Sequence, residues 1–142
     1  MTIREFRIED YEQVIGLWQK AHLPHKPRGR DSKEAIRREL HAHNAVFLVA
    51  EEKGVLVGSI FGTHDGRKGW INRVATAPAY QRQGIARALV RETERRFREM
   101  GIKIIACLIE DWNTSSIAFF EKIGYGAYKG ILYFTKRENP DV

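Results

Sequence analysis

The spacing of hydrophobic residues changes several times along the chain, and each change predicts a new element. Residues 2–7 predict a short strand, and Glu9-Asp10 then offers an N-cap for a helix with one apolar face. Asp31 and Glu34 have the spacing of a capping box, which predicts that a second helix begins there and runs to about residue 43. The Pro/Gly-rich segment 23–30 is predicted to be the loop between the two helices.

Three extended segments come next, separated by turn residues. Residues 45–51 and 55–63 predict a hairpin across a Lys-Gly turn. A second turn, at 66–69, leads into a strand over 70–76. These segments therefore predict an antiparallel part of a sheet.

After Pro78 the apolar spacing becomes helical and predicts the longest helix of the chain, with Gly101 as its C-terminal stop. Residues 103–109 form a near-continuous apolar run, which is typical of a strand buried on both faces and therefore central in the sheet. A helix that connects two strands in this way implies a right-handed crossover, so we expect this strand to run parallel to 70–76.

The last part of the chain predicts a helix over 113–122, ended by Gly124, and a final strand over 130–135. No internal repeat or interdomain linker interrupts the pattern. We therefore expect one α/β domain over 1–142, with a mixed sheet and helices on both faces.

The composition indicates more about the cellular location and the class of partner than about the function. The net charge is +6, from 24 Lys and Arg against 18 Asp and Glu, which favours anionic partners of several kinds. The single cysteine, Cys107, rules out an intrachain disulfide, and its place in an apolar strand favours a core role over a nucleophilic one. We see no metal-binding cluster, secretion signal or membrane-spanning run of ~20 apolar residues, and we expect a cytoplasmic protein without a metal or a membrane partner.

Between 70 and 87 the predicted order is strand, turn, glycine, helix, which is suited to binding an anion. The first N–H groups of a helix lack intrahelical partners and lie at the positive end of the helix dipole. Gly84 and Ala86 are small enough to let an anion approach, and Arg82 and Arg87 add positive charge. A turn glycine between two surface arginines is the alternative interpretation.

Two motifs make a resemblance to a known family specific. Residues 74–89, which contain Gln81-Arg82-Gln83-Gly84-Ile85-Ala86, resemble the cofactor motif of the GNAT superfamily of N-acetyltransferases. Asn113 and the stretch 119–125 resemble the family's later Asn…Phe-Tyr-Glu-Lys-x-Gly-Phe motif, in the expected order. The similarity is good over about 45–135, and the 80–84 stretch is similar to the branch that acetylates the N-termini of ribosomal proteins.

The resemblance implies a GNAT-like fold, with a mostly antiparallel sheet in which 70–76 and 103–109 form a splayed parallel pair. It also implies acetyl-CoA as cosubstrate, its pantetheine arm along the first of these strands and its pyrophosphate at the turn. The cofactor-binding residues implied by the resemblance are Val74, Ala75, Thr76, Arg82, Gln83, Gly84, Ile85, Ala86, Arg87, Asn113 and Phe120.

Acyl transfer from a thioester to an amine needs a neutral amine, a stabilised oxyanion and a proton for the leaving thiolate. A backbone N–H of 74–76 is the natural oxyanion donor, and Glu110 is the candidate base, or else an exposed carboxylate at a strand end. Phe120 stands where many family members have a tyrosine that protonates the thiolate. Water, Tyr125 or Tyr133 could take that role, or the thiolate could leave unassisted.

The sequence thus predicts an enzyme that transfers acetyl from acetyl-CoA to a primary amine by direct attack in a ternary complex. The acceptor, a small amine, an amino acid or a protein N-terminus or lysine, stays open, as does the choice between monomer and homodimer. A non-catalytic acyl-CoA-binding module is the second hypothesis, because of Phe120. A basic nucleic-acid-binding domain is the third, although the chain has no recognisable nucleic-acid motif and we expect no such partner.

Overall fold

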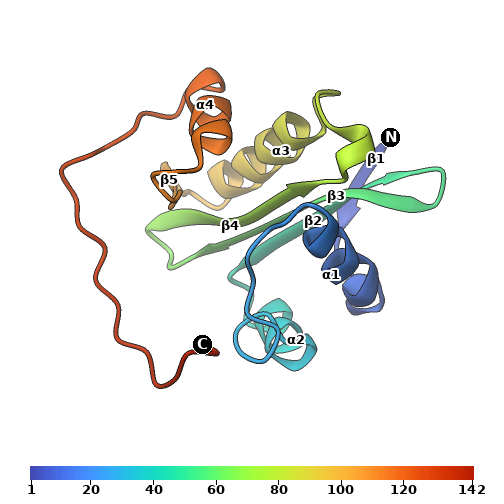
Figure 1. Ribbon diagram of the computed structural model, residues 1–142, viewed down its shortest axis with the longest axis horizontal. Helices are drawn as coiled ribbons and strands as arrows, with labels where there is room; N and C mark the ends of the chain where they lie inside the picture. Colours follow the sequence, from blue (N-terminus) through green and yellow to red (C-terminus); the bar gives the residue numbers. More distant parts are fainter.

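The computed structural model describes residues 1–142, and its centre is a five-stranded sheet with helices on both faces (Figure 1). The strands are β1 (Thr2–Glu5), β2 (Ala45–Glu52), β3 (Val55–His64), β4 (Lys68–Thr76) and β5 (Ile104–Cys107). The helices are α1 (Tyr11–Lys20), α2 (Lys33–His41), α3 (Ile85–Glu99) and α4 (Thr114–Lys122), with 3-10 turns η1 (Ile8–Asp10) and η2 (Pro78–Tyr80). The strand order is β1-β2-β3-β4-β5, antiparallel except for the parallel pair β4–β5, so the predicted mixed sheet is confirmed.

Backbone geometry explains why two predicted boundaries fall where they do. Lys53 and Gly54 both have positive φ, 50° and 79°, as the tight hairpin turn between β2 and β3 requires. Gly101, with φ of 82°, ends α3 in a left-handed conformation, and the N–H of Ile102 donates back to the carbonyl of Phe97 at 2.9 Å. Both turns were predicted from sequence and are confirmed.

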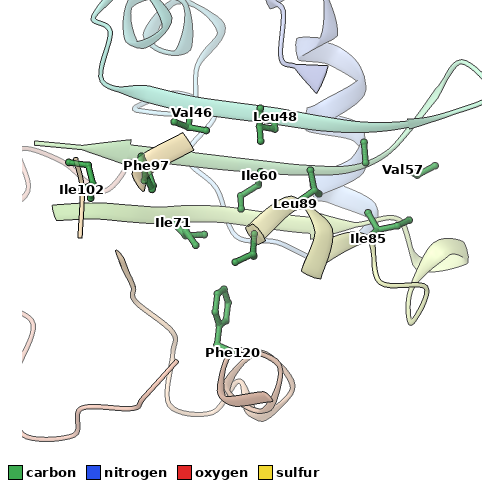
Figure 2. Close-up of a cluster of buried hydrophobic side chains, with 12 residues drawn as sticks. Val46, Leu48, Val57, Ile60, Ile71, Ile85, Leu89, Phe97, Ile102 and Phe120 are labelled. Atoms are coloured by element: carbon green, nitrogen blue, oxygen red, sulfur yellow. The ribbon is translucent and has the colours of Figure 1, made fainter. Parts of the chain in front are cut away.

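Alternating residues of the sheet build two separate hydrophobic cores. On one face, Leu48 and Ile60 pack against α3, in a cluster that also receives Phe120 from α4 (Figure 2). On the other face, Phe47 and Phe61 stack at 3.9 Å between ring centroids, in a cluster with residues of α1 and α2. Period-two alternation along β2 supplies both cores. Along β3 the alternation is interrupted near Val57, where the register with β2 shifts, and both cores still draw on this strand. No helix of the chain combines the length and apolar character that a membrane span requires.

Helix α3 lies unusually close to β3, at Gly58. A Cβ atom on Gly58 would lie 2.7 Å from Cγ2 of Ile85 and 3.1 Å from a Cδ atom of Leu89. Only glycine permits this approach, which fixes the first turn of α3 against the sheet. The start of α3 is therefore positioned by packing as well as by the turn that precedes it.

The N-terminus of α2 corrects the sequence-based prediction. The N-cap is Ser32, whose Oγ accepts a hydrogen bond from the N–H of Ala35 at 3.1 Å, rather than Asp31. Asp31 is buried and its carboxylate accepts from the N–H of Lys26 and from Arg73. Serine and aspartate are both favoured caps, and the tertiary partner Arg73 decides between them.

Two predictions about the C-terminal third are wrong. The strand predicted over 103–109 as a buried central strand is shorter, Ile104–Cys107, and forms the edge of the sheet with Ile104 exposed. The strand predicted over 130–135 does not form, and residues 126–142 have no helix or strand. The two errors are related, because a strand in the C-terminal segment could have paired with the outer edge of β5, and none forms.

Candidate active site

Strands β4 and β5 separate in the middle of β4. They pair from Lys68↔Ile104 to Ile71↔Cys107, and beyond that point β4 continues to Thr76 without a partner on this side. At the same point β4 contains a bulge, because Arg73 and Ile71 lie opposite consecutive residues of β3 and Asn72 is the extra residue. Bulges and strand ends free backbone N–H and C=O groups for other partners. The backbone of β4 beyond Ile71 therefore lines an opening in the sheet.

The turn between β4 and α3 has the shape of an anion cradle. Arg82 and Gly84 both have left-handed backbones, with φ of 64° and 82°. None of the N–H groups from Gln83 to Arg87 donates to a protein acceptor, and α3 has no side-chain cap at its N-terminus. Free N–H groups at a helix start attract anions, and a non-glycine residue with positive φ is a form of strain found at binding sites. The turn thus presents several converging donors without protein partners.

Charge and space at the turn suit a pyrophosphate. The side chains of Arg82 and Arg87 are exposed and form no ion pair. A Cβ atom on Gly84 would point into open space, with no atom within 4 Å. A hollow of about 430 Å³ lined in part by Tyr80, Gln83 and Ile85 adjoins the turn. The residues present therefore fit the diphosphate of coenzyme A.

The predicted pantetheine residues lie directly before this turn. Val74 packs against the α3 core and Ala75 belongs to the opposite core, so their side chains point to the two faces of the sheet. Their backbone groups lie in the plane of the sheet, and on one side that plane is the opening left by β5. Val74, Ala75 and Thr76 can therefore offer main-chain groups to a ligand in the opening.

On the α1/α2 face, a buried ion pair lies beside the opening. Arg73 contacts Asp31 at 2.9 Å, and their side chains are only 15% and 9% exposed. The hydroxyl of Tyr11 donates to the carbonyl of Asp31 at 2.8 Å, and the N–H of Lys26 donates to its carboxylate at 2.7 Å. These contacts fix the 22–31 loop against β4. The sequence analysis missed this pair, although a charged residue within the apolar 70–76 strand was a usable signal.

Two of the predicted residues, Asn113 and Phe120, lie at the start of α4 and within it. Asn113 caps α4, because its Oδ1 accepts from the N–H of Ser116 at 3.3 Å, which leaves its Nδ2 free to donate elsewhere. Phe120 is buried and forms edge-to-face contacts with Phe119 and Tyr125, each with ring centroids 5.1 Å apart. The side chain of Phe120 therefore belongs to the core, in the same cluster as Ile71 of β4.

Of the two hydroxyl groups considered as proton donors, one is held in a hydrogen bond and the other lies on the C-terminal segment. Tyr125 donates to a carboxylate oxygen of Glu94 at 2.8 Å, and burial raises the pKa of its hydroxyl well above the usual range. Tyr133 is exposed on the C-terminal segment. Glu110, the candidate base, is exposed between β5 and α4, and its carboxylate has no hydrogen-bond partner in the protein. The carbonyl of Glu110 accepts from the N–H of Asn113 at 2.9 Å, but its carboxylate forms no hydrogen bond with any of the other predicted residues.

Solved structures share this arrangement of strands and helices. The PaiA N-acetyltransferase of Thermoplasma acidophilum, in complex with coenzyme A, superposes with a TM-score of 0.80 at 22% identity, over 89% of this chain and 90% of that one. The structure of AAC(6′)-Iy, in complex with the bisubstrate analogue CoA-S-monomethyl-acetylneamine, gives a TM-score of 0.80 at 20% identity, over 96% and 97%. At these identities the likeness establishes the fold.

Sequence similarity establishes more than the fold. An acetyltransferase of Sodalis glossinidius is 36% identical over 137 residues, which cover 96% of this chain and 95% of that protein. The family profile described as the acetyltransferase (GNAT) family matches residues 4–125, which include the opening between β4 and β5 and the turn before α3. The chain is therefore a member of the GNAT family of acetyltransferases.

Proposed function

We propose that this acetyltransferase moves an acetyl group from acetyl-CoA to a primary amine, by direct attack of the amine within a ternary complex. The observation that carries the proposal is the set of unpaired N–H groups from Gln83 to Arg87, next to the unpaired backbone of β4. The turn would hold the diphosphate, with Arg82 and Arg87 beside it, and the β4 backbone would hold the pantetheine arm through Val74 to Thr76. Acetyl-CoA supplies the acetyl group as an activated thioester.

Groups of the protein itself would stabilise the developing negative charge, accept the proton of the amine and bind the cosubstrate. An N–H of β4 beyond the bulge at Asn72 would stabilise the negative charge that develops on the thioester oxygen, a contribution often worth about 10²–10³ in rate. Glu110 would accept the proton of the ammonium group, through water because its carboxylate is exposed. The Nδ2 of Asn113 would donate to the cosubstrate farther along.

Phe120 leaves the departing thiolate without a tyrosine partner. Tyr125 is held by Glu94 and cannot turn to the opening without losing that hydrogen bond. We infer that water protonates the thiolate, which lowers the rate relative to a positioned acid by about 10²–10⁴. The structure also offers a check on this idea, because Phe120→Tyr would place a hydroxyl at the end of the same buried ring.

The class of acceptor amine is the open part of the proposal. The loop 22–31 and the Arg73–Asp31 pair border the opening on the α1/α2 face, opposite α3, and we place the acceptor there. AAC(6′)-Iy binds an aminoglycoside-derived analogue, so aminoglycosides belong in the acceptor pool together with small amines, amino acids and peptides. We further infer that 1–142 form a single domain, since every helix contributes to a core built on one sheet.

The test combines calorimetric titration of acetyl-CoA with release of free thiol in the presence of pooled acceptors, using wild type and Gly84→Glu. The added carboxylate would face the diphosphate, and we expect affinity to fall by more than about tenfold. Gly66→Glu is the matched control, because Gly66 also has positive φ, 85°, and open space at its Cβ but lies in the β3–β4 turn. Gly66→Glu should bind as wild type does.

Each outcome has a defined meaning. Binding lost only in Gly84→Glu, with amine-dependent thiol release, supports the proposed reaction. Binding without turnover for any amine in the acceptor pool would favour a non-catalytic acyl-CoA-binding protein. This is the alternative suggested by Phe120, which stands where many family members have a tyrosine. Equal binding of acetyl-CoA by Gly84→Glu and wild type would show that this turn is not part of the binding site.

A further inference from the structure

The loop 22–31 presents a positively charged face that the loop itself does not neutralise. Its charged side chains are those of Lys26, Arg28 and Arg30, together with one acidic residue. That residue, Asp31, is buried and already paired with an arginine of β4. The side chain of Arg28 is 80% exposed, and Arg30 is exposed and forms no ion pair. A group of cations beside a binding site attracts ligands of negative charge.

Hydrogen bonds within the loop hold this face in a fixed shape. The N–H groups of Gly29 and Asp31 both donate to the carbonyl of Lys26 at 3.0 Å, and the N–H of Ser32 donates to the carbonyl of Gly29 at 3.1 Å. The N–H of Lys26 donates in turn to the carboxylate of Asp31 at 2.7 Å. A site that is already ordered loses less conformational entropy when a ligand binds. The basic face is therefore preformed.

A segment of the chain itself lies on this face. Residues 126–140 are exposed throughout, but the two residues that follow are half-buried where the chain reaches the loop beside α2 (Figure 1). The Nζ of Lys26 donates to the carbonyl of Pro140 at 2.9 Å, and Arg28 pairs with the carboxylate of Asp141 at 3.0 Å. The loop donates and the segment accepts in both contacts, as expected for a basic face and an acidic peptide.

The shape of the contact also suits a peptide. The N–H of Asp141 donates to Oδ1 of Asn139 at 2.9 Å, so the segment forms a local turn that presents the carboxylate. A Cβ atom on Gly29 would overlap the carbonyl oxygen of Asp141 and would lie 3.1 Å from Cα of Val142. Only glycine lets a peptide backbone approach the loop so closely.

We propose that the basic face of loop 22–31 binds an acidic segment of the acceptor, and that residues 140–142 occupy this place until the acceptor displaces them. The inference rests on the proposed function and adds a class of acceptor, a peptide whose amine lies near carboxylates. The Arg28–Asp141 pair is weak, because its side chains are 80% and 48% exposed, so the internal segment is easily displaced. Polycationic amines, including aminoglycosides, would be repelled by the same face.

The test is the binding of two peptides with a free N-terminal amine and a fluorescent label at the other end, followed by anisotropy at low salt with coenzyme A present. One peptide is rich in glutamate, and in the other every glutamate is replaced by glutamine. We expect wild type to bind the glutamate peptide at least about tenfold more tightly. Arg28→Glu/Arg30→Glu should lose this preference. Arg67→Glu/Lys103→Glu makes the same change of charge at two exposed cations beside the start of β4, and this control should keep it.

Asp141→Asn tests the competition by the internal segment. The substitution removes the ion pair with Arg28 and leaves the cations of the loop in place. The apparent affinity for the glutamate peptide should then rise by about two- to fivefold, because more of the protein has an open loop. Glu138→Gln is the matched control, since this carboxylate is exposed and forms no ion pair, and it should bind as wild type does.

Three results would overturn the proposal: equal binding of the two peptides by wild type, a preference that survives in Arg28→Glu/Arg30→Glu, or no gain in affinity in Asp141→Asn. Thermal unfolding followed by circular dichroism shows whether each variant is folded. Thiol release from acetyl-CoA is recorded separately. Tight binding of the glutamate peptide without thiol release would support the loop site and count against the proposed reaction. Equal thiol release with both peptides would support the reaction and overturn the acidic acceptor.

Discussion

Gly58→Ala is the substitution that most directly tests how packing positions the proposed acetyl-CoA site. The new methyl carbon would lie 2.7 Å from Cγ2 of Ile85 and 3.1 Å from a Cδ atom of Leu89, so the first turn of α3 must move away from β3. Overpacking of this kind costs about 1–3 kcal/mol. For a chain of this size we expect Tm to fall by about 3–10 °C.

The same movement should weaken binding, because the N–H of Ile85 is one of the unpaired donors at the turn. Loss of about one hydrogen bond to a charged group corresponds to about a tenfold rise in the Kd for acetyl-CoA. The assays are thermal unfolding followed by circular dichroism and calorimetric titration of acetyl-CoA.

Substitutions at two other glycines serve as controls for Gly58→Ala. A Cβ on Gly62 would meet Phe97 and Thr93 at 3.1 and 3.3 Å, in the second half of α3, so Gly62→Ala should lower Tm but leave the Kd unchanged. Gly16 lies within α1 with no atom within 4 Å of its Cβ position, and Gly16→Ala should raise stability by about 0.5–1 kcal/mol. An unchanged Tm and Kd in Gly58→Ala would refute the argument that this contact sets the place of the turn.

Three further predictions concern buried polar groups. Ser59→Ala removes the partner of the indole N–H of Trp18, now 2.9 Å away, and should lower the free energy of unfolding in urea by about 1–3 kcal/mol; no change would show that water replaces the hydroxyl. Hydrogen bonds from Arg4 hold the pKa of the Asp10 carboxyl below its usual 3.8, so this pair contributes stability above that pH and loses it as the pH falls through the lower folded value. Acid titration of wild type against Arg4→Met should therefore show a stability difference that is largest near neutral pH and shrinks below about pH 4. Burial raises the pKa of Cys107 to about 11, so thiol reagents at pH 8 should label the unfolded chain about 100-fold faster than the folded one, and equal rates would contradict the burial of the thiol.

Local patterns predicted the parts of this fold that local interactions determine. The turn at Lys53-Gly54 and the stop at Gly101 depend on left-handed backbone geometry, which glycine signals directly. The left-handed turn before α3 was predicted for the same reason, because Gly84 precedes a helix. In each case the residues that decide the conformation are neighbours in the sequence.

The parts that sequence could not predict depend on distant partners. Asp31 loses the cap of α2 to Ser32 because Arg73, on β4, binds its carboxylate. The apolar run that forms β5 was correctly predicted to be a strand parallel to β4, but its pattern also predicted a central position, and β5 lies at the edge because no later segment pairs with it. Glu110 lies beyond the end of β5 with an exposed carboxylate, so no neighbouring side chain in the sequence or the fold fixes its position.

The division of the sheet into two cores has a consequence for how the protein can change. Residues that hold α3 and the turn belong to one core, and residues that hold α1, α2 and the 22–31 loop belong to the other. Substitutions without shared contacts tend to add in their effects on stability. The α1/α2 side, where we propose that the acceptor binds, can therefore accumulate substitutions while the α3 side, proposed to bind acetyl-CoA, keeps its geometry, so that a single scaffold can be redirected by laboratory or natural evolution one face at a time.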